Sequence, residues 1–86
     1  MNETTVGPQS YHHLRDLSLV AALVTRGFEI IRIERVGARC HFIFADTKSI
    51  RADINRYWAN ELVVSAREYA EKTKMLKSRI YSELGL

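Results

Sequence analysis

Three histidines and one cysteine are the clearest candidates in this chain for metal binding or nucleophilic catalysis. They fall into two adjacent pairs, His12-His13 and Cys40-His41. A zinc site needs three or four ligands that converge on one ion, and a nucleophile needs a base beside it. Adjacent residues of an extended strand point to opposite faces, so neither pair can do this. We therefore expect no catalytic residue, no metal site and no cofactor, and we expect that the protein is not an enzyme.

A run of cations in the second half of the chain could instead bind anions. The net charge is +3, and residues 1–46 carry five basic and five acidic side chains, which cancel. Residues 47–86 carry eight basic and five acidic side chains. Basic residues gathered on one face attract nucleic acid, although an ordinary solvated surface has similar charges. The candidate nucleic-acid-binding residues are Lys48, Arg51, Lys72, Lys74, Lys77 and Arg79.

Two further features of the predicted helices bear on this surface. Lys77 falls inside the apolar stripe of the last helix, between Ala70 and Tyr81. We expect its methylene stem to lie along the core with the ammonium in water; the alternative is a charge at the rim of a groove for an anionic partner. The pair Tyr57-Trp58 could form a stacking platform for nucleic acid, but its place on an apolar helix face favours core packing.

The elements that position these residues begin with a helix over residues 17–26. Asp16 is expected to cap it and Gly27 to end it. Its apolar residues form more than one stripe, so the helix must be covered on more than one side. Either it is the central helix of the fold, or part of it is buried against a second molecule.

A β-hairpin is predicted next, over residues 28–36 and 39–45, because both segments are rich in β-branched and aromatic residues. A two-residue loop that begins with Gly37 permits a type II′ turn, and a shift by one residue would turn charged side chains inward. The face expected in the core carries Ile31 opposite Phe44, together with Ile33, Cys40 and Phe42. The other face is polar apart from Ile30 and Ile43, which suggests cover by the N-terminal segment or by a partner.

Two helices follow the hairpin. Asp46 or Thr47 is expected to cap a helix over residues 48–60, and Ser65 to open the last helix through a capping box. The predicted buried stripe of the last helix is Ala66, Tyr69, Ala70, Thr73, Leu76, Ile80 and Leu84, flanked by Tyr81. The order helix, hairpin, helix, helix predicts a small α+β domain over residues 10–86.

Length and composition agree with one small domain. Eighty-six residues, 47% of them hydrophobic, exclude two full domains and wholesale disorder. The longest apolar run, residues 19–24, is far shorter than the roughly 20 residues that span a bilayer. A single cysteine and a polar start without a signal sequence suit a cytoplasmic protein. Residues 1–9 are expected to be a disordered lead-in, and residues 10–14 could form a short strand.

Several segments resemble an uncharacterised family of small bacterial and phage-encoded domains. The matching segments are Asp16-Leu17-Ser18-Leu19-Val20-Ala21-Ala22-Leu23, Gly27-Phe28, residues 40–46, Tyr57-Trp58 and residues 76–81. The resemblance covers nearly all of the chain after residue 10. Because that family is a domain of unknown function found in phages, plasmids and their hosts, it implies a bacterial or mobile-element origin and no activity. Lys77 and Arg79 belong to one of the matching segments.

The leading hypothesis is a small accessory protein of phage or plasmid type, located in the cytoplasm of a bacterium or of an infected host. It would bind nucleic acid, or a nucleic-acid-processing complex, through its basic C-terminal half. The alternative is a protein-interaction module, either a homodimer or an inhibitor of a host protein, without nucleic-acid contact. Neither hypothesis includes a membrane or a small-molecule ligand. The first requires the cations of the last two helices to gather on one surface.

Overall fold

The structure, a computed structural model, describes residues 10–85, so the predicted lead-in over residues 1–9 lies outside the described residues. The elements in chain order are β1 (Tyr11–Leu14), α1 (Leu17–Thr25), β2 (Arg32–Val36), β3 (Arg39–Ala45), α2 (Lys48–Trp58) and α3 (Ala66–Leu84). This is the predicted α+β class, and the order of helix, hairpin, helix and helix is confirmed. The short strand before the first helix is present as well.

The three strands form an antiparallel sheet in the order β1–β3–β2, with β3 in the centre. The hairpin has the predicted register, in which Val36 pairs with Arg39. Gly37 has a φ of +63°, as the first loop position of a type II′ turn requires. On the core face of β3 the buried residues are Cys40, Phe42 and Phe44, and Ile33 of β2 packs against them.

Ile43 is fully buried although it lies on the polar face of the hairpin. It pairs with His13 of β1 on one side and with Arg32 of β2 on the other. The Arg32 guanidinium lies over the Tyr11 ring, 5.9 Å from its centroid, so these two side chains meet across β3 and cover Ile43. The sequence suggested that the N-terminal segment or a partner covers Ile43. In the structure, side chains of β1 and β2 cover it.

The first strand of the hairpin is shorter than predicted, because β2 begins only at Arg32. Ile31 donates its N–H to the Ile43 carbonyl at 2.8 Å, and Arg32 pairs with the same residue. Two residues of one strand facing one residue of the other is the pattern of a β-bulge. The bulge leaves the Ile31 side chain exposed, so its predicted core position opposite Phe44 is wrong.

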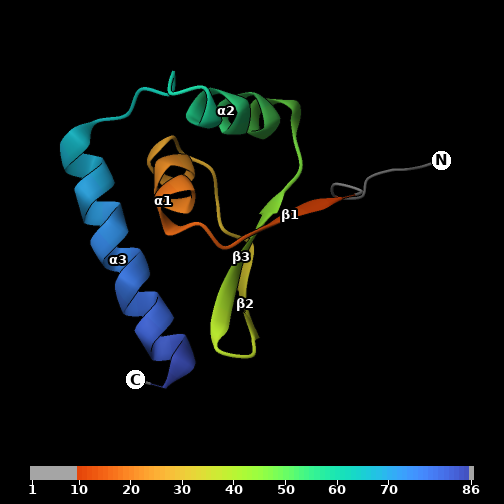
Figure 1. The fold of residues 1–86 in the computed structure, drawn as a ribbon, viewed down its shortest axis with the longest axis vertical. Helices are drawn as coiled ribbons and strands as arrows, with labels where there is room; N and C mark the ends of the chain where they lie inside the picture. Colours follow the sequence, from red (N-terminus) through yellow and green to blue (C-terminus); the bar gives the residue numbers. More distant parts are fainter. Residues whose placement is uncertain (1–9, 86) are drawn as a thin grey trace.

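Helix α1 lies at the centre of the fold (Figure 1). Asp16 caps it as predicted, accepting the Leu19 N–H at 3.2 Å. Five consecutive residues, 19–23, are buried. Helices α2 and α3 both pack against α1, and α3 also contacts β3. The prediction that this is the central helix of the fold is therefore confirmed, because other segments of the same chain cover it.

Helix α2 is capped by Thr47, whose hydroxyl accepts the Ile50 N–H at 3.1 Å. This choice between the two predicted caps leaves the Asp46 side chain available for other contacts. The helix ends at Trp58, two residues earlier than predicted, because Asn60 adopts a left-handed conformation with a φ of 61°.

A buried carboxylate, Asp53, joins α2 to the end of α1. It accepts hydrogen bonds from Arg26 Nε at 2.9 Å and from Arg56 Nη1 at 2.6 Å. Burial raises the pKa of Asp53, but the hydrogen bonds from the two arginines outweigh burial and hold that pKa below its ordinary value of 3.8. Asp53 is thus a charged clamp between the two helices.

Helix α3 starts at the predicted cap, where Ser65 Oγ accepts the Glu68 N–H at 3.4 Å. Its buried or half-buried stripe is Tyr69, Thr73, Leu76, Ile80 and Leu84, and Lys72 beside this stripe is half-buried as well. Ala66, Ala70 and Tyr81 are exposed, so the stripe is narrower than predicted. Lys77 lies on the exposed side with them.

We predict that Leu76→Ala lowers the free energy of unfolding by about 2–5 kcal/mol, because it leaves a cavity where α3 meets the core. Tyr81→Ala on the exposed face of the same helix is the matched control and should change it by no more than about 0.5 kcal/mol. Urea denaturation followed by circular dichroism measures both. Equal losses in the two variants would contradict this orientation of α3.

Candidate functional site

The four cations of α3 that were predicted to bind nucleic acid do not lie on one surface. Lys74 and Lys77, three residues apart, are neighbours on its exposed side, and Lys72 and Arg79, seven residues apart, share another side. Residues two positions apart on a helix point in nearly opposite directions, so Lys72 and Lys74 diverge. The buried stripe through Leu76 separates the two pairs. Within residues 10–85 none of the four forms an ion pair.

The other two predicted cations, Lys48 and Arg51, lie in the first turns of α2. Figure 1 shows that this end of α2 is on the side of the molecule away from α3. Lys48 is exposed, and Arg51 forms an ion pair with Asp46 at 2.6 Å. The six residues predicted to bind nucleic acid therefore occupy three separate places.

Basic side chains converge instead on an open hollow of about 710 Å³ between β1, the turn into α1, and α2. Three arginines line it, Arg15 from the turn, Arg39 from β3 and Arg51 from α2, beside His12 and His13 from β1. Asp16 is the one acid of the lining, and its carboxylate caps α1. We call this site the basic hollow.

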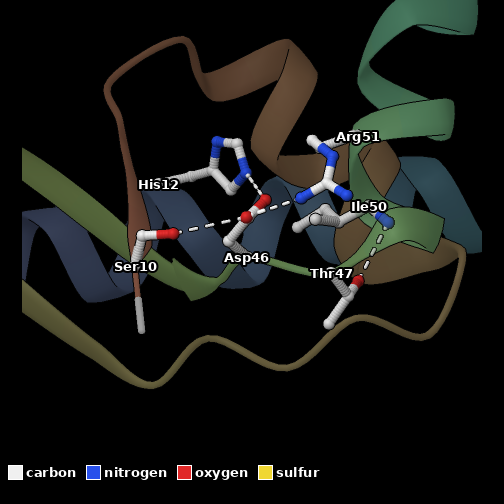
Figure 2. A network of polar contacts seen from close by, with 6 residues as sticks. All are labelled: Ser10, His12, Asp46, Thr47, Ile50 and Arg51. Carbon is white, nitrogen blue, oxygen red and sulfur yellow. Dashed lines mark hydrogen bonds and ion pairs between the residues drawn. The ribbon is translucent and has the colours of Figure 1, made fainter. Parts of the chain in front are cut away.

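Asp46 contacts two residues that line the basic hollow, His12 and Arg51 (Figure 2). Its Oδ1 lies 2.8 Å from His12 Nε2, and its Oδ2 accepts hydrogen bonds from Arg51 Nη1 at 2.6 Å and Ser10 Oγ at 3.3 Å. Because Thr47 caps α2, the Asp46 carboxylate can make all three contacts. One residue at the end of β3 thereby connects β1 to α2.

The hydrogen bond with His12 is the largest cause that lowers the pKa of Asp46 below its ordinary value of 3.8. Partial burial acts in the opposite direction, and the contact with Arg51 lowers the pKa further. Asp46 is therefore ionised at neutral pH and offsets part of the charge of Arg51. Arg15 and Arg39, in contrast, have no carboxylate partner among the described residues, and both are exposed.

Trp58 stands at the rim of the basic hollow and is 64% exposed. Its ring packs edge to face on Tyr57, with the ring centroids 5.0 Å apart and the planes at 86°. Tyr57 is half-buried against the core. Core packing is therefore confirmed for Tyr57 and wrong for Trp58, which is the last residue of α2, just before the chain turns away.

Within residues 10–85, His, Cys, Asp and Glu side chains form no group of three that could hold a metal ion. Cys40 is buried on the core face of β3, and its neighbour His41 lies on the opposite face. None of the helices in this part of the chain combines the length and apolar character needed to cross a bilayer.

Of the three arginines in the basic hollow, the sequence prediction included only Arg51. It missed Arg15 and Arg39 because they belong to the half of the chain in which positive and negative charges cancel. One signal could have revealed Arg15. Asp16 was predicted to cap the first helix, so its carboxylate is engaged by a backbone N–H and leaves the neighbouring Arg15 without an ion pair among the described residues.

Comparison with known proteins gives a family match. A family model described as a domain of unknown function, DUF5659, matches residues 9–82 of the chain. This range contains the whole of the sheet, α1, α2 and all but the last two residues of α3. No curated protein and no solved structure matches the chain.

We predict that acid weakens the fold through Asp46 and Asp53. Because both pKa values are lower in the folded chain than their ordinary value of 3.8, the ionised carboxylates stabilise the fold above that pH. This contribution is lost as the pH falls through 3.8 toward the lower folded values. Asp46→Asn should be less stable than the natural chain at pH 7 and should lose less stability on acidification.

Urea unfolding at a series of values between about pH 7 and pH 3 measures this difference. Glu61→Gln is the matched control, because Glu61 is exposed and forms no ion pair within the described residues. Its stability should follow that of the natural chain at every pH. An Asp46→Asn curve parallel to that of the natural chain would contradict the role of Asp46.

Proposed function

We propose that this chain, which belongs to the DUF5659 family of domains of unknown function, is a non-enzymatic protein that binds nucleic acid through the basic hollow. One observation carries the proposal: arginines from three separate elements converge on one open hollow that has a single acid in its lining. The planar guanidinium group suits phosphate, because it can donate two parallel hydrogen bonds to one phosphate group.

The three arginines have different parts in this proposal. Arg15 and Arg39 are exposed and carry uncompensated charge, so they supply the main attraction for phosphate groups. Arg51 is held in place by Asp46, and Asn55, one turn further along α2, lines the same hollow with an amide that can donate to phosphate oxygens. Contacts of this type position a nucleic-acid backbone and do not read its sequence.

The proposed interface differs from the one predicted from the sequence. It retains Arg51 and replaces the cations of α3 by Arg15 and Arg39, because the α3 cations are divided between two sides of the helix. Lys74 and Lys77 remain exposed and could add long-range attraction. A cytoplasmic location in a bacterium or an infected host fits a nucleic-acid ligand and a single reduced cysteine, and we include it in the proposal.

A protein partner is the second candidate, and one observation favours it. Val63, in the connection between α2 and α3, is 78% exposed and lies near Trp58 in the chain, so apolar surface is open to solvent there. The sequence suggested a protein partner because α1 and Ile43 had apolar surface without evident cover. Both are covered within the chain, so they no longer support a partner. Light scattering that shows a dimer, with no oligonucleotide binding, would favour this second candidate.

We predict that Arg15→Ala and Arg39→Ala each weaken the binding of oligonucleotides. Each should also reduce the slope of log affinity against log salt concentration by about 1, because one phosphate contact is lost. Lys77→Ala is the matched control, since it removes a cation from the exposed side of α3. Fluorescence anisotropy of a labelled oligonucleotide over a series of salt concentrations measures all three variants.

Two outcomes of this measurement would contradict the proposal. If no oligonucleotide binds even at low salt, the chain is not a nucleic-acid-binding protein of this type. If Lys77→Ala weakens binding and the two arginine variants do not, the interface lies on α3 as the sequence indicated.

A further inference from the structure

A second hollow, of about 400 Å³, adjoins the basic hollow at Trp58, which lines both. It lies between the end of α2, the connection over residues 59–65, and the start of α3. Apart from the Asn60 amide, its lining is apolar or aromatic and includes Leu62, Val64 and Tyr69. We call it the apolar hollow. A single exposed indole ring thus stands between a cationic site and an apolar one.

The orientation of the Trp58 ring is set before any ligand arrives. Its edge-to-face contact with Tyr57 fixes the ring, and Tyr57 is held by its packing against the core. A side chain that is already ordered loses little conformational freedom when a ligand binds to it. With 64% of its surface exposed, Trp58 therefore offers a preorganised flat platform.

We propose that Trp58 stacks on a base of a single-stranded nucleic acid whose neighbouring phosphates lie in the basic hollow; this inference rests on the proposed function. Arg15 and Arg39 attract a polyanion through their positive charge. The indole ring and the apolar hollow beside it favour contact with a flat, weakly polar group. A single strand presents both at adjacent positions along its length. In a duplex the base faces are stacked on one another, so no base face is free to lie on the indole ring.

The test uses the natural fluorescence of the chain. Trp58 is the single tryptophan, so indole emission reports on this ring alone. We would titrate the full chain at low salt with oligo(dT), oligo(U) and a DNA duplex of the same length, and record indole emission together with the anisotropy of a labelled strand. The single strands should quench the emission and bind more tightly than the duplex, which should leave the emission unchanged. The two homopolymers distinguish DNA from RNA.

Trp58→Ala should weaken single-strand binding by at least about fivefold, because one base–ring stack is lost, and should leave duplex binding unchanged. Trp58→Phe, which keeps a ring, should recover part of the affinity. Tyr81→Ala is the matched control, because Tyr81 is an exposed aromatic residue on α3, outside both hollows. It should have no effect on either ligand.

The outcomes separate this inference from the proposed function. Salt-dependent binding without quenching, or equal affinity for single strand and duplex, would overturn the stacking role and leave the basic hollow as the binding site. No binding of any oligonucleotide would overturn both. Quenching by an acidic peptide in the absence of oligonucleotide binding would also overturn both and would assign the two hollows to a protein partner.

Discussion

A nine-residue helix with five consecutive buried residues can persist in water only if other segments cover it on every side. This constraint on α1 accounts for the arrangement of the rest of the chain. Helices α2 and α3 pack against it, α3 extends to β3, and the Asp53 clamp holds the middle of α2 to the end of α1. Since the cover is complete within one chain, the surfaces that remain for partners are those on the outside of these layers, and the basic hollow is one of them.

The parts of the fold that depend on local interactions were predictable from the sequence. Asp16 and Ser65 both cap helices where expected, and the hairpin register follows from its turn and its apolar alternation. The predictions that were wrong concern features that depend on tertiary packing. The bulge at Ile31, the end of α2 before Asn60 and the exposure of Trp58 depend on how segments meet in space, and local periodicity contains no information on that.

The candidate site was predicted less well, for a geometric reason. Cations that are close in sequence on a helix spread around it, and the run from Lys72 to Arg79 is divided by the buried stripe. Arg15, Arg39 and Arg51 are far apart in sequence but line the same hollow, because β1 lies beside β3 and Asp46 connects β1 to α2. A charge count over halves of the chain cannot detect such convergence. To predict this convergence, one must know which strand lies next to which helix, and which acids already form ion pairs or cap helices.

The burial of Cys40 on the core face of β3 has a practical consequence. Since it is the one thiol of the chain, alkylating reagents can react only in molecules whose core has transiently opened. The rate of alkylation under native conditions therefore measures how often the sheet separates from the helices, without an introduced label. For the same reason, air oxidation should link two copies only through opened molecules, and crosslinked material would serve as an index of conformational opening during storage.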